Sequence, residues 1–172
     1  MFWKRKVADG LEPSASTDDG GMAPVRIYTA EAIIGGWVDL AGQRLSDLLN
    51  TEEVLDVAGV SELPADDQWT LMDRANMLLV VPPPHIADRR LRSHRVKRNI
   101  LVLTGHYVVR GLVHQVPGIA LDPFLARSRQ HFLALTDTRV TSTERPEIDE
   151  RHPALLVNVR STAQQLKLEV LA

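Results

Sequence analysis

The histidines are the side chains of this chain most able to bind a metal ion or to transfer a proton. His106 and His114 are eight residues apart in one apolar stretch, so on a strand they share a face but lie about 26 Å apart. One ion cannot bridge that distance, because a histidine nitrogen binds zinc at about 2 Å. The other four form no ligand-like spacing: His85, His94, His131 and His152. The sequence therefore predicts no metal site.

Other residues capable of catalysis lack the pattern that catalysis requires. Acidic residues are grouped at positions 66–67 and 144–150, in polar stretches where carboxylates are normally solvated and form no general acid and base pair. No serine lies in a Gly-x-Ser-x-Gly motif, and the glycine pairs at 20–21 and 35–36 lack the residues of a phosphate-binding loop. The chain has no cysteine, which excludes thiol nucleophiles and disulfides. We expect a protein that is not an enzyme and needs no cofactor.

The net charge of -2 hides an uneven distribution. Residues 89–98 carry no acid and include Arg89, Arg90, Arg92, Arg95, Lys97 and Arg98. Such a cluster can neutralise the phosphates of a nucleic acid or another anionic ligand. The alternative is a solvated linker that pairs with the acidic loops of the same molecule.

The N-terminal residues are also basic and aromatic: Phe2, Trp3, Lys4, Arg5 and Lys6. They suggest weak contact with an anionic membrane surface, and the alternative is a frayed terminus. No apolar segment of a secretory signal follows them, and no stretch approaches the roughly 18 apolar residues that a membrane span needs. We expect a soluble, cytoplasmic protein without a transmembrane segment.

The sequence contains an internal repeat. Residues 25–40 match residues 100–115 in physical type at an offset of 75. The matched positions are Thr29 with Thr104, Ile33 and Ile34 with Val108 and Val109, Gly36 with Gly111, and Trp37 with Leu112. In each copy the pattern predicts an antiparallel hairpin whose second strand is bent at a glycine.

Further elements are expected in the same order in both copies. After the first hairpin, the pattern predicts a helical turn at 44–50 capped by Ser46, and strands at 53–60 and 76–81. We expect the second copy to place a turn at 121–125 and strands at 132–135 and 154–158. Two segments, 96–103 and 166–171, are candidates for a fifth strand.

A unit of four or five short strands with one helical turn resembles the small barrels of the SH3-like and Sm-like class. More narrowly, the runs Ile34-Gly35-Gly36 and Phe132-Leu133-Ala134-Leu135-Thr136-Asp137 look like segments of an uncharacterised bacterial family with a predicted Sm-like barrel, as do residues 44–50 and 156–158. The resemblance covers residues 25–85 and 99–160. It implies a fold and a binding role, without a known activity.

We therefore expect a mainly β protein with a disordered tail (1–24), a first barrel (25–88), a basic linker (89–98) and a second barrel (99–172). The favoured function is a non-enzymatic binding or assembly module whose partner is a protein or a second copy. The alternative is a regulator that binds nucleic acid or an anionic ligand through the basic linker. Four residues are candidates for an interface: Trp37, Leu112, Tyr28 and Tyr107.

Functions peculiar to one copy are expected where the copies differ. These pairs are Glu31 and His106, Gly35 and Arg110, Trp37 and Leu112, and Asp39 and His114.

Overall fold

The fold is mainly β. The computed structural model describes residues 21–59, 69–84, 95–118, 130–160 and 167–170. The first half of the chain contains β1 (Met22–Tyr28), β2 (Ile33–Asp39), α1 (Leu45–Thr51), β3 (Val54–Ala58), β4 (Trp69–Asp73), the short helix η1 (Arg74–Asn76) and β5 (Leu79–Val81). The second half contains β6 (Val96–Thr104), β7 (Tyr107–Gln115), β8 (Phe132–Ser142), β9 (Asp149–Asn158) and β10 (Lys167–Val170). No helix in these ranges is long and apolar enough to cross a membrane.

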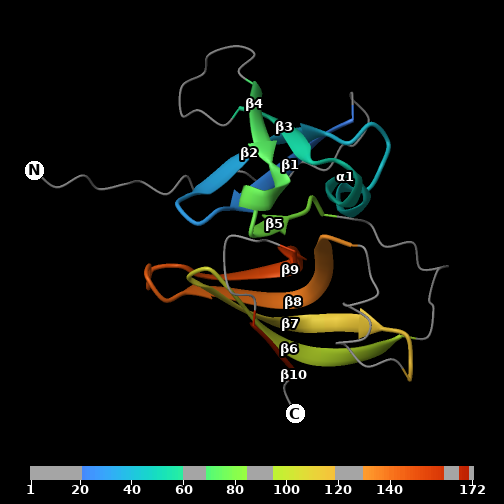
Figure 1. The fold of residues 1–172 in the computed structure, drawn as a ribbon, viewed down its shortest axis with the longest axis vertical. Coiled ribbons are helices and arrows are strands. Elements are labelled where there is room, and N and C mark those ends of the chain that lie inside the picture. Colours follow the sequence, from blue (N-terminus) through green and yellow to red (C-terminus); the bar gives the residue numbers. More distant parts are fainter. Residues whose placement is uncertain (1–20, 60–68, 85–94, 119–129, 161–166, 171–172) are drawn as a thin grey trace, which may run out of the picture.

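All ten strands belong to one antiparallel sheet, in the order β10-β6-β7-β8-β9-β5-β1-β2-β3-β4. The two halves follow the same internal order, because β5-β1-β2-β3-β4 in the first corresponds to β10-β6-β7-β8-β9 in the second. Figure 1 shows the halves one above the other, with β5 beside β9 where they meet. The described strands form this open sheet, and a tandem pair of separate closed barrels is not seen among them.

The two predicted hairpins are present. In the first, Val25 pairs with Gly36 and Ile27 with Ile34. In the second, Ile100 pairs with Gly111 and Val102 with Val109. Every one of these residues is offset by 75 from its counterpart, so the two hairpins share one register as well as one sequence pattern.

Several expected boundaries were wrong. β1 begins at Met22, inside the expected tail, because residues 22–24 pair with the end of β2. Residues 96–98 belong to β6 and not to a linker, since they pair with residues 113–115 of β7. Ser46 does not cap α1, because Arg44 occupies the N-cap position and makes no side-chain cap hydrogen bond.

The fourth strand of each half was also misplaced. The predicted strand at 76–81 is the end of η1 followed by β5, and the preceding strand, β4, was not expected. By strand order, β9 corresponds to β4 and not to β5, and β10 corresponds to β5. The expected turn at 121–125 lies outside the described residues.

A glycine allows β7 and β8 to bend around each other. The register between them shifts at Gly111, where a Cβ atom would lie 2.8 Å from the Thr138 side chain. Asp137, beside this point, has a φ of 51°, which is the left-handed conformation of a bulge. A larger residue at position 111 would clash with Thr138, so glycine is required there. The glycine lies at the irregularity of β7, where a bend was expected.

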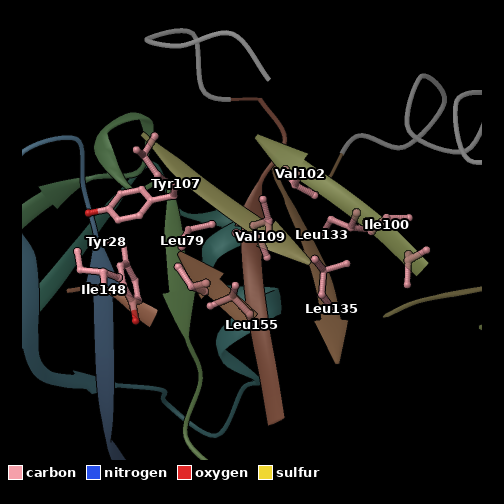
Figure 2. Close-up of a cluster of buried hydrophobic side chains, with 14 residues drawn as sticks. Tyr28, Leu79, Ile100, Val102, Tyr107, Val109, Leu133, Leu135, Ile148 and Leu155 are labelled. Atoms are coloured by element: carbon pink, nitrogen blue, oxygen red, sulfur yellow. The ribbon is translucent and has the colours of Figure 1, made fainter. Parts of the chain in front are cut away.

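The cores of the two halves are interlocked. Tyr28, Leu78 and Leu79 come from the first half but pack with the buried aliphatic side chains of β6 to β9. Figure 2 shows Tyr28 and Leu79 among Val109, Leu155 and their neighbours. Conversely, Phe132 and Leu156 of the second half pack into the core of the first. Neither half has a complete core of its own.

Two asparagines, Asn158 buried and Asn50 half-buried, join the halves through side-chain hydrogen bonds. The Asn50 side chain, at the end of α1, accepts hydrogen bonds from the backbone N–H groups of His131 (2.6 Å) and Phe132 (3.0 Å). The Asn158 side chain donates to the carbonyl oxygens of Arg74 (3.0 Å) and Met77 (2.9 Å). Each asparagine thus makes hydrogen bonds to backbone groups that lie about 80 residues away in the other half.

We predict that Asn158→Ala lowers the free energy of unfolding by about 1–3 kcal/mol, because the carbonyl oxygens of Arg74 and Met77 lose the hydrogen bonds that the buried Asn158 side chain donates. Urea denaturation would measure the change. Asn99→Ala is the matched control, since Asn99 is exposed on β6. Equal stabilities for the two variants would contradict a role for Asn158 in joining the halves.

Candidate functional site

The residues predicted to bind anions are only partly described. Arg89, Arg90 and Arg92 lie outside the described residues, as do Phe2, Trp3, Lys4, Arg5 and Lys6. Arg95 is exposed just before β6, Lys97 is exposed on β6, and Arg98 is half-buried. The charges of Lys97 and Arg95 help to lower the pKa of His114, after the larger effect of burial. The described part of the cluster therefore lies beside the end of β7.

The four interface candidates are placed in different surroundings. Tyr28 and Tyr107 are fully buried, and their rings meet edge to face with centroids 5.4 Å apart (Figure 2). The Tyr107 hydroxyl donates to the carbonyl oxygen of Thr29, 3.1 Å away, so the two tyrosines lie where the halves meet. Leu112 is half-buried on β7, whereas Trp37 is exposed on β2. These residues do not form one continuous exposed surface.

A polar cluster surrounds Tyr28. Its hydroxyl donates to Glu150 over 2.7 Å and lies 2.9 Å from the Nε2 atom of His152. Arg26 donates to the same carboxylate over 2.7 Å. Burial raises the pKa of Tyr28, and the hydrogen bond to Glu150 adds to this effect. Burial lowers the pKa of His152, with the charge of Glu150 acting in the opposite direction.

A second cluster surrounds Tyr107. Arg145 donates to the Tyr107 hydroxyl (3.2 Å) and to the carbonyl oxygen of Glu31 (3.3 Å), and its Nη2 atom lies 3.2 Å from Nε2 of His106. Burial raises the pKa of Tyr107 and lowers the pKa of His106. In both clusters the polar atoms bind one another, so their evident role is to join the halves around two buried phenols.

The first half carries an exposed apolar surface. Four of the six large exposed apolar side chains in the described ranges lie on β2, β3 and β4: Trp37 (44% exposed), Val54 (47%), Trp69 (50%) and Leu71 (73%). Trp37 and Trp69 both pair with Ala58, and Leu71 pairs with Asp56, so these side chains point to one side of the sheet. We call this surface the β2–β4 face.

A shallow hollow of about 490 Å³ adjoins the β2–β4 face. Its lining includes Leu48, Val54 and Trp69 together with the carboxylates of Asp39, Glu52 and Asp56, and it contains no lysine or arginine. The surface is thus apolar and acidic. A set of histidine, cysteine or acidic residues that could hold a metal ion is not found among the residues the structure describes.

Sequence reasoning identified Trp37 and Trp69 as apolar side chains that could line a groove or an interface, but it missed the strand that brings them to one side of the sheet. The missing strand was β4, whose Trp69 and Leu71 complete the β2–β4 face. The run Trp69-Thr70-Leu71-Met72-Asp73 contains several residues that are common in strands, and it could have predicted β4. The polar residues just before this run made the whole stretch resemble a loop.

Comparisons with protein-family models, with curated proteins and with solved structures found no match.

The pKa shift of His152 leads to a prediction about acid stability. Its pKa is lowered from 6.5 in the folded protein, so the unfolded chain binds the proton more readily. The resulting stability is present above about pH 6.5 and is lost as the pH falls through the lower pKa of the folded state. The pKa values of His106, His114 and His131 shift in the same direction.

We predict that the free energy of unfolding falls as the pH is lowered below about 6.5, and that His152→Gln reduces this fall, because glutamine does not take up a proton. Urea denaturation across the pH range would measure both effects. A pH dependence identical in the variant and the wild type would rule out His152 as a contributor.

Proposed function

We propose that this protein is a non-enzymatic binding and assembly module that acts in the cytoplasm. The observation that carries the proposal is the β2–β4 face, where two exposed tryptophans, Val54 and Leu71 adjoin the strand at one end of the sheet. Exposed apolar patches of this kind are typical of protein interaction sites.

We further infer that the chain is a tandem duplication of a small Sm-like or SH3-like barrel, as in the uncharacterised bacterial family that its sequence resembles. The equal strand order of the halves and the offset of 75 shared by their hairpins support this inference. Each half then corresponds to one five-stranded unit. Such a small unit has a marginal core alone, which fits the interlocked cores.

The partner proposed for the β2–β4 face is a second copy of this chain. Within one chain the halves join by pairing β9 of the second half with β5 of the first. The strands equivalent to these two are β4 and β10, which stand at the ends of the sheet and each pair with one neighbour among the described strands. Pairing β10 of one copy with β4 of the next would repeat the internal junction between molecules.

Assembly of this kind is head to tail, so it produces either a closed ring or an open filament. The apolar side chains of Trp69 and Leu71 on β4 would be covered in the process. An exposed edge strand presents unpaired backbone N–H and C=O groups, with which the edge strand of another chain can pair.

We predict that the wild-type protein forms larger species as its concentration rises from about 1 to about 100 μM, and that Trp69→Lys combined with Leu71→Lys weakens this association at least about tenfold. Sedimentation velocity would measure the species, and circular dichroism would confirm folding. Val116→Lys is the matched control, because Val116 is also exposed (57%) but lies after β7. A wild type that stays monomeric throughout, or a double variant that associates normally, would refute self-assembly through β4.

The alternative function is binding of nucleic acid or another anionic ligand through the basic residues 89–98. The exposed position of Lys97 beside Arg95 favours it, because a cation held on a strand is already oriented toward solvent.

This alternative predicts binding of single-stranded RNA or DNA at about 50 mM salt that weakens steeply as salt is raised. Replacing Arg92, Arg95 and Arg98 by alanine should remove most of the binding, as measured by fluorescence anisotropy. Absent binding at low salt, or unchanged binding by the triple variant, would exclude this function.

A further inference from the structure

Three arginines form a row across the second half of the sheet. Arg110 of β7 pairs in register with Arg139 of β8, and Arg139 pairs with Arg151 of β9. These three strands lie side by side in Figure 1. All three arginines are exposed, and residues opposite each other on neighbouring strands point to the same side of a sheet. We call this set the arginine row.

Like charges directly opposite each other destabilise a sheet, and the row contains two such pairs in succession. Only one carboxylate compensates within the described residues. Asp149 accepts two hydrogen bonds from Arg139, at 2.7 and 2.6 Å, and these hydrogen bonds lower its pKa. In the same part of the chain, no hydrogen bond or ion pair links Arg110 or Arg151 to another residue. The row therefore has guanidinium groups available to an external anion.

The row borders a hollow of about 400 Å³ on the surface of β8 and β9. Arg139 and Arg151 line it together with Thr138 and His152, and Asp137 is the one acidic residue in its lining. The hollow lies at the bulge where Asp137 adopts a positive φ. Two arginine side chains thus face a concave polar surface.

We propose that the arginine row binds a chain of two or three phosphate groups. Three neighbouring strands span about 10 Å, a length that matches a linked series of two or three phosphates. Guanidinium groups bind phosphate oxygens through paired hydrogen bonds, and this geometry makes arginine more effective than lysine at such sites. The ligand would relieve the repulsion within the row by placing negative charge between its members.

This site is separate from the β2–β4 face and from the basic residues 89–98. Arg110 and Lys97 both belong to the second half, but Lys97 pairs with His114, four residues further along β7. The site is a property of a single chain and requires no assembly. Its failure would leave self-association through β4 untouched.

The test is isothermal titration calorimetry of the full chain with inorganic phosphate, diphosphate and triphosphate at low salt. We expect affinity to rise from phosphate to triphosphate, and to fall about tenfold in Arg110→Gln and in Arg151→Gln. Arg44→Gln is the matched control, since Arg44 is an exposed arginine of the first half. Asp149→Asn should bind triphosphate more tightly, because it removes the carboxylate that competes for Arg139.

The same titration with a nucleoside triphosphate shows whether the protein also contacts the nucleoside. Affinity equal to that of inorganic triphosphate would identify the phosphates alone as the recognised group, and greater affinity would add a contact to the nucleoside. Both results support the proposal. It is overturned if triphosphate does not bind at about 1 mM, or if the Arg110 and Arg151 variants bind as the wild type does. Loss of binding only when Arg92, Arg95 and Arg98 are replaced would also overturn it, since the anion would then bind to residues 89–98.

The thermal midpoint of each variant, measured without phosphate, separates a role in phosphate binding from a role in folding. A residue needed for folding would lower the thermal midpoint when replaced. Because the row is repulsive, Arg110→Gln should leave the midpoint unchanged or raise it slightly in the absence of phosphate. A lower midpoint together with weaker binding in that variant would count against the proposal.

Discussion

The rest of the structure depends on how β5 is held between two neighbours. This strand has three residues, and it pairs with β1 on one side and with β9 on the other. Leu79 and Val80 are fully buried, so their backbone groups must be bonded within the protein. If β5 were displaced, β1 and β9 would both expose an unpaired edge, and the two halves would lose their common sheet.

Burying tyrosines at such a junction imposes a second requirement, because a buried phenol hydroxyl needs a hydrogen-bonding partner. Tyr28 obtains its partners from Glu150 and His152, and Tyr107 obtains one from Thr29. These three partners belong to the opposite half, and Arg145 of the same half also donates to the Tyr107 hydroxyl. Side chains that could be taken for an acid, a base and a cation of an active site are thus explained by the need to join the halves.

The sequence predicted those parts of the fold that depend on local pattern. The hairpins follow from β-branched residues around a glycine, and even their register is visible in the offset between Ile27 and Val102. The positions of β4 and β9 could not be predicted in the same way. Only the last residues of β9 are apolar and buried, and two of them, Leu156 and Val157, pair with β5 of the other half. This short apolar run resembles β5 more than it resembles its counterpart β4.

The functional surfaces were harder to predict for a related reason. Arg110, Arg139 and Arg151 are widely separated in sequence and meet only through the pairing of three strands. The burial of Tyr28 and Tyr107 likewise results from contact between the halves. The sequence made both residues candidates for an interface without showing that their rings meet. Information about long-range register was needed in both cases.

The differences between the two hairpins acquire a physical meaning in the structure. Ile27 and its counterpart Val102 are both fully buried, and a change of type there would disturb a core. Two differences between the hairpins fall in the proposed surfaces: Gly35 corresponds to Arg110 of the arginine row, both exposed, and exposed Trp37 of the β2–β4 face corresponds to half-buried Leu112. One half consequently presents an apolar, acidic surface, and the other presents guanidinium groups. The two surfaces lie on different strands of the sheet, so a ligand on one does not block the other. A self-assembling chain would therefore carry one phosphate site in every copy.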